Sequence, residues 1–404
     1  MYAQITAEAG GATNALFNLI NNLDKGQYTP VVLFAREGKY LDEFEKVGCK
    51  VFISKLGQIT NTVHSPLKGN FRTLFMLGYF CFRLPFDIYT ILKLIKREGI
   101  ELVHINVSTL YSVAIAAKLA KVKVIWHVRE VLNRNWVTKF QVFFINKFST
   151  LILCVSSFVS ESFTNKEKIL VVYDGIDISN VKILNDENSI RKIANTKKED
   201  IVILMFGIIS GAFGKGFYDY LDAISIVGKT EKNLVFWVLG DSPIPGFFQK
   251  LRNTIFYLLR RNSETERIIL EKKTKELKIK KLVRFLGYSK NVFDYINAAD
   301  IVVIPPRFPE GFGLTLIEAG ALGKPVIATN IGPTPEIITN NVSGILTEAG
   351  APNALAKSII RLVQNPLLGN TLGKTFYQKV LPKFNISITH YKINNIYAKI
   401  FSEH

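Results

Sequence analysis

The feature that most constrains the fold is a regular alternation of short apolar runs with longer helical patterns, which occurs twice along the 404 residues. Helical patterns such as Thr13–Leu23 and Asp87–Arg97 separate the runs of the first series. An order of strand, helix and strand predicts a parallel, doubly wound sheet. The strands expected in this first half are Tyr2–Thr6, Thr29–Phe34, Glu101–Ile105, Lys123–Trp126 and Leu151–Val155.

A second series of apolar runs begins after the polar stretch Asp174–Asp200, which we interpret as a linker. At about 100–200 residues per domain, the chain is long enough for two domains. We therefore expect an α/β protein made of two Rossmann-like halves. The strands expected in the second half are Ile201–Phe206, Leu234–Leu239, Leu282–Leu286, Ile301–Pro305 and Pro325–Ala328.

The composition excludes several classes of protein and of site. With 27 glycines, 14 prolines and 3 cysteines, the chain is neither collagen-like, mucin-like nor a disulfide scaffold. The cysteines lack metal-ligand spacing, and no Asp-x-Asp motif is present, so we expect no metal and no cofactor. The N-terminus shows no signal-peptide pattern, and no run is long and apolar enough for a spanning helix. We expect a cytoplasmic location.

The formal net charge of +18 is concentrated in two windows. Residues 51–150 carry 14 basic and 4 acidic residues, and residues 245–290 carry 13 and 4. In Asn70–Arg97 and Pro245–Arg261, basic residues alternate with Phe, Leu and Tyr. Basic amphipathic helices lie on anionic membrane surfaces, which predicts a peripheral protein at the inner face of the cell membrane. The alternative is ordinary helices with a solvated basic face. No nucleic-acid-binding pattern appears.

The segment Pro305–Glu336 is the richest candidate for a site. It follows an expected strand, carries Gly311 and Gly313 in a loop, and continues into an expected helix from Leu314 to Leu322. A glycine-bearing loop at a helix N-terminus presents free N–H groups to an anion such as a diphosphate. Glu310 and Glu318 flank this loop, and carboxylates accept hydrogen bonds from sugar or ribose hydroxyls. The alternatives are an exposed loop acid at 310 and a capping box, Thr315-x-x-Glu318, that places Glu318 in the first helical turn.

Two further glycine-bearing loops follow expected strands. Phe206–Phe217 contains glycines 207, 211, 214 and 216, with Lys215 as a point charge, but it lacks the spacing of a Walker A motif. Gly10 and Gly11 follow the first strand, where the backbone can approach a ligand or simply make a tight turn.

The histidines differ in their expected positions. His104 lies within a strand and is interpreted as a core residue with satisfied hydrogen bonds. His127 lies at the carboxyl end of its strand, where open α/β sheets bind ligands. The neighbouring Arg129 and Glu130 either bind an acceptor or pair with each other.

Taken together, these motifs resemble glycosyltransferase family 4, whose E-x7-E signature corresponds to Glu310-GFGLTLI-Glu318. The resemblance extends over nearly the whole chain. It implies the GT-B fold, with two Rossmann-like domains facing across a cleft and a C-terminal helix crossing back to the first domain. The corresponding domains are 1–185 on the acceptor side, 186–374 for the nucleotide sugar, and 375–404 as the returning helical segment. The other matching motifs are Val171–Asp177, Lys215–Gly216, Val238–Asp241, Val283–Tyr288 and Asn297–Pro306.

The resemblance also implies a retaining, metal-independent transfer of a sugar from a nucleotide diphosphate sugar. His127, Glu310 and Lys215 take the catalytic roles, and Lys215 stabilises the diphosphate leaving group. Glu318 holds the ribose hydroxyls. The donor-binding residues implied are Gly10, Gly11, Gly207, Lys215, Gly311, Phe312, Gly313, Leu314, Thr315 and Glu318.

Three departures from the family pattern stand out. Ile208 replaces the arginine usual after Gly207, Asp174 stands where asparagine is common in a hinge strand of structural role, and Pro243–Lys280 is longer and more basic than usual. The function expected is transfer to a glycan or lipid-linked acceptor in cell-surface polysaccharide or glycolipid synthesis. The alternatives are a GT-B nucleotide-sugar epimerase and a non-enzymatic sugar-nucleotide-binding protein.

Overall fold

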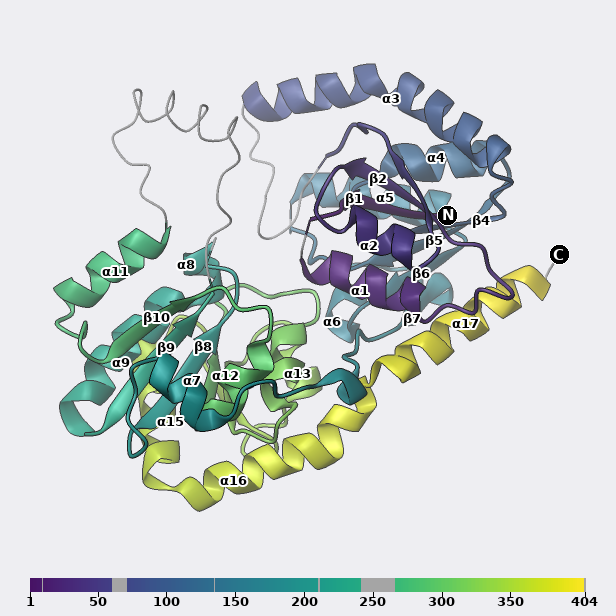
Figure 1. The fold of residues 1–404 in the computed structure, drawn as a ribbon. Coiled ribbons are helices and arrows are strands. Elements are labelled where there is room, and N and C mark those ends of the chain that lie inside the picture. The colour runs from purple at the N-terminus through teal and green to yellow at the C-terminus, as the bar shows by residue number, and fades with distance from the viewer. Residues whose placement is uncertain (9, 60–70, 134, 210, 241–265, 403–404) are drawn as a thin grey trace. The chain divides into compact units, whose positions relative to one another are not determined.

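The computed structural model describes residues 1–8, 10–59, 71–133, 135–209, 211–240 and 266–402 (Figure 1). The chain forms two compact units. Unit 1 comprises Met1–Ile176, Pro309–Leu314 and Phe384–His404, and unit 2 comprises Asp177–Phe308 and Thr315–Lys383.

Unit 1 is built on a seven-stranded parallel sheet in the order β3-β2-β1-β4-β5-β6-β7. The order reverses between β1 and β4, as it does in doubly wound folds. The central strands β1, β4 and β5 are buried along most of their length because helices cover both faces of a parallel sheet. The strands are β1 (Tyr2–Thr6), β2 (Val31–Arg36), β3 (Lys50–Ile53), β4 (Leu102–Ile105), β5 (Lys123–Val128), β6 (Leu151–Cys154) and β7 (Ile169–Val171).

The helices of unit 1 include one that comes from the far end of the sequence. Ile393, Tyr397 and Ile400 of the C-terminal helix are buried in the same core cluster as Leu16 and Ile125. The last helix therefore completes the first sheet's core, as predicted. The helices are α1 (Gly11–Asn21), α2 (Leu41–Lys46), α3 (Phe71–Arg97), α4 (Tyr111–Leu119), α5 (Trp136–Phe148), α6 (Ser157–Ser160), η1 (Lys166–Lys168) and α17 (Ile386–Ser402).

Unit 2 repeats the plan with a six-stranded parallel sheet in the order β10-β9-β8-β11-β12-β13. Here the order reverses between β8 and β11. All six residues of β9 and all four of β11 are buried. The strands are β8 (Ile201–Phe206), β9 (Leu234–Leu239), β10 (Val283–Gly287), β11 (Ile301–Ile304), β12 (Val326–Thr329) and β13 (Ile345–Thr347).

The helices of unit 2 cover both faces of its sheet, and α9 and α15 supply much of the core through Leu221, Ile224, Leu355 and Ile359. The architecture confirms the predicted α/β class with two Rossmann-like sheets. The helices are η2 (Ile178–Asn180), α7 (Glu187–Ile193), α8 (Ala212–Lys215), α9 (Phe217–Thr230), α11 (Glu266–Glu276), α12 (Val292–Ala298), α13 (Leu314–Gly320), α14 (Thr334–Ile337), α15 (Pro352–Gln364) and α16 (Pro366–Thr375), followed by η3 (Phe376–Val380) and η4 (Leu381–Phe384).

One prediction about local structure was wrong, and another gave only part of a helix. The polar stretch expected to be a linker contains α7, which is N-capped by Asp186 and buries Ile190. The helix expected at Asp87–Arg97 begins at Phe71 and continues through Pro85. In the first case, too few apolar residues face the core to give a helical pattern.

Two predictions concerned a membrane: a basic amphipathic helix and the lack of a membrane-spanning helix. The helix expected at Pro245–Arg261 lies outside the described residues. Among the helices that the structure describes, including the 27-residue α3, none has the length and apolar character to span a bilayer.

Candidate active site

The two glycine-bearing segments of unit 2 leave neighbouring strands at the point where the strand order reverses. Gly207 directly follows β8, and Pro305 directly follows β11. β8 and β11 pair in parallel, so their carboxyl ends lie at the same edge of the sheet. Open α/β sheets bind ligands at this position. The structure therefore brings together two segments that are about a hundred residues apart in sequence.

The loop carrying Lys215 passes directly against the backbone that follows β11. Gly216 has φ +82°, and a Cβ atom there would lie 1.8 Å from the carbonyl oxygen of Pro305. Only glycine fits both the conformation and the space. The close approach fixes the position of Lys215, whose N–H donates to Gly211 at 3.1 Å.

Arg307 holds the same loop in place and was not predicted from the sequence. Its guanidinium donates to both carboxylate oxygens of Asp219, at 2.5 and 2.6 Å. It also lies 4.3 Å from the ring centroid of Phe213, and its backbone N–H donates to Gly214 at 2.8 Å. Bidentate pairing and ring stacking suit arginine rather than lysine. Arg307 thus ties the Lys215 loop to the start of α9.

The start of α13 differs from one predicted alternative. The helix begins at Leu314, so Thr315 lies inside it and cannot be the N-cap of a capping box. Glu318 consequently lies in the second turn rather than the first. Burial raises the pKa of the Glu318 carboxyl from 4.5 to about 7. Because Glu318 does not cap its helix, the capping box cannot explain why a carboxyl is partly buried at this position.

The segment Pro309–Leu314, which carries the first part of the E-x7-E motif, groups with unit 1, whereas the part from Thr315 to Glu318 groups with unit 2. Ser156 Oγ donates to the carbonyl of Gly311 at 2.7 Å. A Cβ atom on Gly311 would lie 1.8 Å from the carbonyl oxygen of Arg129. Phe312 is buried and stacks on Tyr173, with ring centroids 5.6 Å apart. Glycine and phenylalanine at these positions therefore anchor the loop, and Glu310 lies half-buried beside them.

His127 is fully buried in β5 and forms a pair with His104 in the neighbouring strand β4. Nε2 of His104 lies 3.2 Å from Nδ1 of His127, and Nδ1 of His104 lies 2.6 Å from the Tyr397 hydroxyl. His104 is thus a core histidine with partners, as predicted. Burial, with the nearby positive charge of Arg129, holds the pKa of His127 well below 6.5 and that of His104 at about 3. Both rings are therefore neutral.

Nε2 of His127 is buried and has no hydrogen-bond partner among the described residues. Arg129, which can only donate, has Nη2 3.5 Å from Nδ1 of His127. This favours a lone pair on Nδ1 and the proton on Nε2. His127 then presents an unused N–H donor, a costly feature in a buried group unless a ligand uses it.

The residues next to His127 do not pair with each other. Arg129 donates from Nη1 to both oxygens of Asp174, at 2.5 and 2.6 Å, and from Nε to Asn106. Glu130 accepts a hydrogen bond from the Ser108 N–H at 3.1 Å. Asp174 thus has a structural partner, in keeping with the structural role expected for its segment.

Gly10 and Gly11 lie at the start of α1, directly after the reversal strand β1. Gly10 is extended, with φ 176°, and no atom lies within 4 Å of a Cβ placed on either glycine. Neither backbone conformation nor packing demands glycine here. The role of these two glycines near a ligand stays a prediction.

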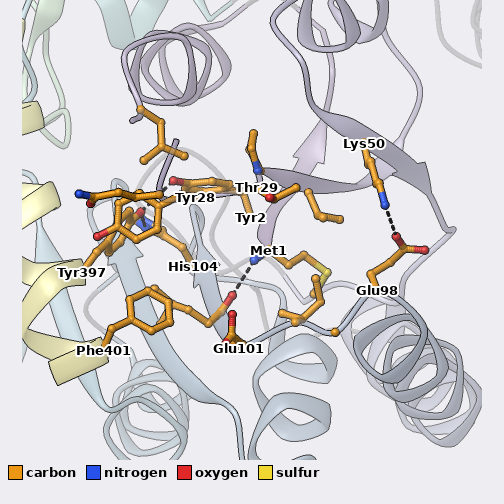
Figure 2. A pocket seen from close by; sticks show the side chains of 17 residues that line it. Met1, Tyr2, Tyr28, Thr29, Lys50, Glu98, Glu101, His104, Tyr397 and Phe401 are labelled. Carbon is orange, nitrogen blue, oxygen red and sulfur yellow. Dashed lines mark hydrogen bonds and ion pairs between the residues drawn. The ribbon is translucent and has the colours of Figure 1, made fainter. Parts of the chain in front are cut away.

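A cavity of about 510 Å³ lies elsewhere in unit 1, at the amino ends of β1, β2 and β4 (Figure 2). Lys50 and Glu98 form an ion pair there at 3.1 Å. His104 lines this cavity and also contacts His127. None of the predicted site residues is among the residues that line the cavity. The cavity lies where these strands of unit 1 begin, whereas His127 lies near the end of its strand β5.

Family models account for most of the chain. The model for glycosyltransferase family 4 matches residues 9–180, and that for glycosyl transferases group 1 matches residues 186–379. The chain is a family 4 glycosyltransferase. The resemblance of the E-x7-E segment and its neighbours is thereby confirmed.

Individual relatives of this glycosyltransferase agree with the family. The UDP-Gal:α-D-GlcNAc-diphosphoundecaprenol α-1,3-galactosyltransferase of Escherichia coli is 24% identical over 326 residues, which are 77% of this chain and 78% of the relative. An uncharacterised glycosyltransferase of Methanocaldococcus jannaschii is 26% identical over 294 residues, 70% of this chain and 71% of the relative. Both are named as transferases, which supports transfer over the epimerase alternative.

The fold of the glycosyltransferase is also found among solved structures. HepE of Anabaena, crystallised with UDP and glucose, has a TM-score of 0.76 at 19% identity, covering 98% of both chains. The similarity confirms the GT-B fold expected from the sequence.

Proposed function

We propose that this glycosyltransferase moves a hexose from a UDP-sugar to a lipid-linked saccharide, with retention of configuration and without a metal ion. The observation that carries the proposal is the pair of segments at the strand-order reversal of unit 2, one with Lys215 and one leading into α13. The Escherichia coli relative is named for UDP-Gal and a diphosphoundecaprenol-linked acceptor. The Anabaena structure contains UDP and glucose.

Each donor-side residue has a role that follows from its chemistry. Lys215 and the first N–H groups of α13, at Gly313, Leu314 and Thr315, stabilise the charge that develops on the diphosphate leaving group. This positive charge takes the place of a metal ion. The carboxylate of Glu318 accepts hydrogen bonds from the ribose hydroxyls.

The residues near the transferred sugar act through hydrogen bonds. Glu310 contacts the donor sugar, and the N–H on Nε2 of His127 donates to one of its hydroxyls. Arg307 is a positioning residue, because it contacts Phe213, Gly214 and Asp219 on either side of Lys215. The site of action is the cytoplasmic face of a membrane, a proposal supported by the basic and apolar windows and by the lipid-linked acceptor of the relative.

The experiment is a melting-temperature screen of the full chain against UDP-, GDP- and ADP-sugars. A ligand that binds only the folded state raises its stability, so we expect a rise with a UDP-sugar and none with the others. Transfer is then measured with EDTA present, and NMR of the product reports the configuration of the new bond. A rise with another nucleotide only, loss of transfer in EDTA, or an inverted product would each contradict the corresponding part of the proposal.

A further inference from the structure

Helix α3 carries apolar residues on two faces, and among the described residues one of these faces packs into the protein. Phe80, Ile91, Leu94 and Ile95 are buried. A second stripe recurs at intervals of three and four residues and is exposed to solvent. It comprises Phe75 (69% exposed), Tyr79 (54%), Phe82 (69%), Phe86 (59%) and Tyr89 (70%). A helix needs one apolar stripe to pack on a core, so the second stripe needs another explanation.

Helix α5 repeats this arrangement nearby. Trp136, Phe140 and Phe143 are 59%, 56% and 55% exposed and lie at the same helical spacing. Helix α4 packs against both α3 and α5, so the three helices lie together in unit 1 (Figure 1). We call these eight side chains the aromatic face.

The exposed charged residues that the structure describes on α3, α4 and α5 are basic. Exposed Lys93 and Lys96 continue the stripe of α3. Lys147 continues that of α5, with Nζ 5.4 Å from the ring centroid of Phe143. Within α3, α4 and α5 the acidic residue is Asp87, which is buried and paired with Arg83 at 2.7 Å. The face is therefore aromatic and cationic.

We propose that the aromatic face docks onto the surface of an anionic lipid bilayer. Phe, Tyr and Trp rings enter the boundary between headgroups and acyl chains, and the lysines bind the lipid phosphates. A second copy of the chain fits less well, because its own α3, α4 and α5 bring no exposed acidic residue among those described to meet the lysines. The inference rests on the proposed function for its purpose, since a lipid-linked acceptor lies in a membrane.

The direction of α3 and α5 determines which edge of the unit 1 sheet lies near the rings of the aromatic face. Helices that connect parallel strands run antiparallel to them, so α3 and α5 begin at the carboxyl edge of the sheet. In both helices the rings come first and the lysines last. The rings thus lie toward the edge where β5 ends beyond His127 and where α1 begins at Gly11.

The test is flotation of the full chain with vesicles of phosphatidylcholine that contain phosphatidylglycerol, or of phosphatidylcholine alone. We expect binding to the anionic vesicles that weakens with salt. The variant with Phe82, Phe86, Trp136 and Phe140 changed to Ser should bind at least about a hundredfold more weakly, because each ring buries a large apolar area. The control changes Tyr288 and Tyr391, which are 73% and 69% exposed elsewhere, to Ser and should bind like the wild type.

Two further measurements separate insertion from simple adhesion. Changing Lys93, Lys96 and Lys147 to Ala should weaken binding by about fivefold for each lysine. Cys81 on α3 is exposed, whereas Cys49 and Cys154 are buried. A polarity-sensitive fluorophore on Cys81 should therefore shift to the blue with anionic vesicles.

The outcomes distinguish this inference from the proposed function. Equal binding by the four-ring variant, or no binding by the wild type, would overturn the docking face. A dimer that the ring substitutions dissociate would make a second copy the occupant and would overturn it too. The melting-temperature rise with a UDP-sugar should be the same in wild type and variants. If flotation depends on the rings but no nucleotide sugar stabilises the protein, the proposed function fails and the docking face stands.

Discussion

The two sheets share a reversal of strand order but place opposite kinds of chemistry there. In unit 2, the reversal between β8 and β11 is followed by glycine-bearing backbone and the cation of Lys215. In unit 1, strand β4 at the reversal and its neighbour β5 carry two neutral, buried imidazoles, His104 and His127. The same strand-order reversal thus carries a charged group in unit 2 and neutral hydrogen-bonding groups in unit 1.

The difference follows from the free-energy cost of burying the charged form of a side chain. An imidazole buried inside a strand loses its proton because burial disfavours the charged form, so the two histidines can act only as neutral groups. Charge stabilises a leaving diphosphate far more than a neutral hydrogen bond stabilises a sugar hydroxyl. Substitutions in unit 2 should therefore have larger effects on transfer than those in unit 1.

The largest effect is expected for Lys215→Ala. Loss of a preorganised positive charge at a developing oxyanion should lower kcat by about 10²–10³-fold. The measurement is the steady-state rate of nucleotide release with donor and acceptor. Lys229→Ala, on the exposed end of α9, is the matched control and should be unaffected. A decrease below about threefold would show that unit 2 does not act through charge.

The second effect concerns stability and comes from Glu318. The folded protein binds this proton more tightly than the unfolded chain, because its folded pKa is about 7 against 4.5. Stability of the free enzyme therefore falls as pH rises from about 4.5 to about 7, and the loss is complete above 7. The loss is about 3 kcal/mol at most, at 1.36 kcal/mol per pKa unit.

Melting temperatures measured across pH check this prediction. Glu318→Gln should melt above the wild type at pH 8, and the difference should vanish near pH 4.5. Glu276→Gln, an exposed change on α11, should track the wild type throughout. A constant difference between Glu318→Gln and the wild type at all pH values would contradict the assignment.

The sequence allowed the strands to be predicted better than the contacts of the site. Tyr2–Thr6, Ile201–Phe206 and Leu234–Leu239 have the predicted bounds. The last two are continuous apolar runs, which is typical of buried parallel strands. Helix α7 was missed because its buried apolar contribution is small.

For the site residues, too, local sequence patterns could be predicted and long-range contacts could not. The glycine loops and the E-x7-E segment are local patterns, so their order along the chain is visible. The ties between Arg307 and Asp219 and between Arg129 and Asp174 join residues 88 and 45 positions apart, and no local pattern encodes them. The start of α13 at Leu314 likewise depends on where its loop is held, which a Thr-x-x-Glu pattern does not reveal.

The smallest effect is expected for His127, and it is the sharpest test of the comparison. His127→Phe keeps a ring but removes the N–H donor, so kcat should fall by about three- to tenfold, the value of one neutral hydrogen bond. His127→Gln restores a donor and should recover part of the rate, and His104→Gln is the matched control because it leaves Nε2 of His127 unchanged. Since the pKa of His127 lies well below 6.5, the ring stays neutral at working pH, and the His127→Phe variant should keep the pH profile of the wild type. A profile that loses an inflection near pH 6.5 in this variant would mean that unit 1 also works through charge, and the contrast between the two sheets would be wrong.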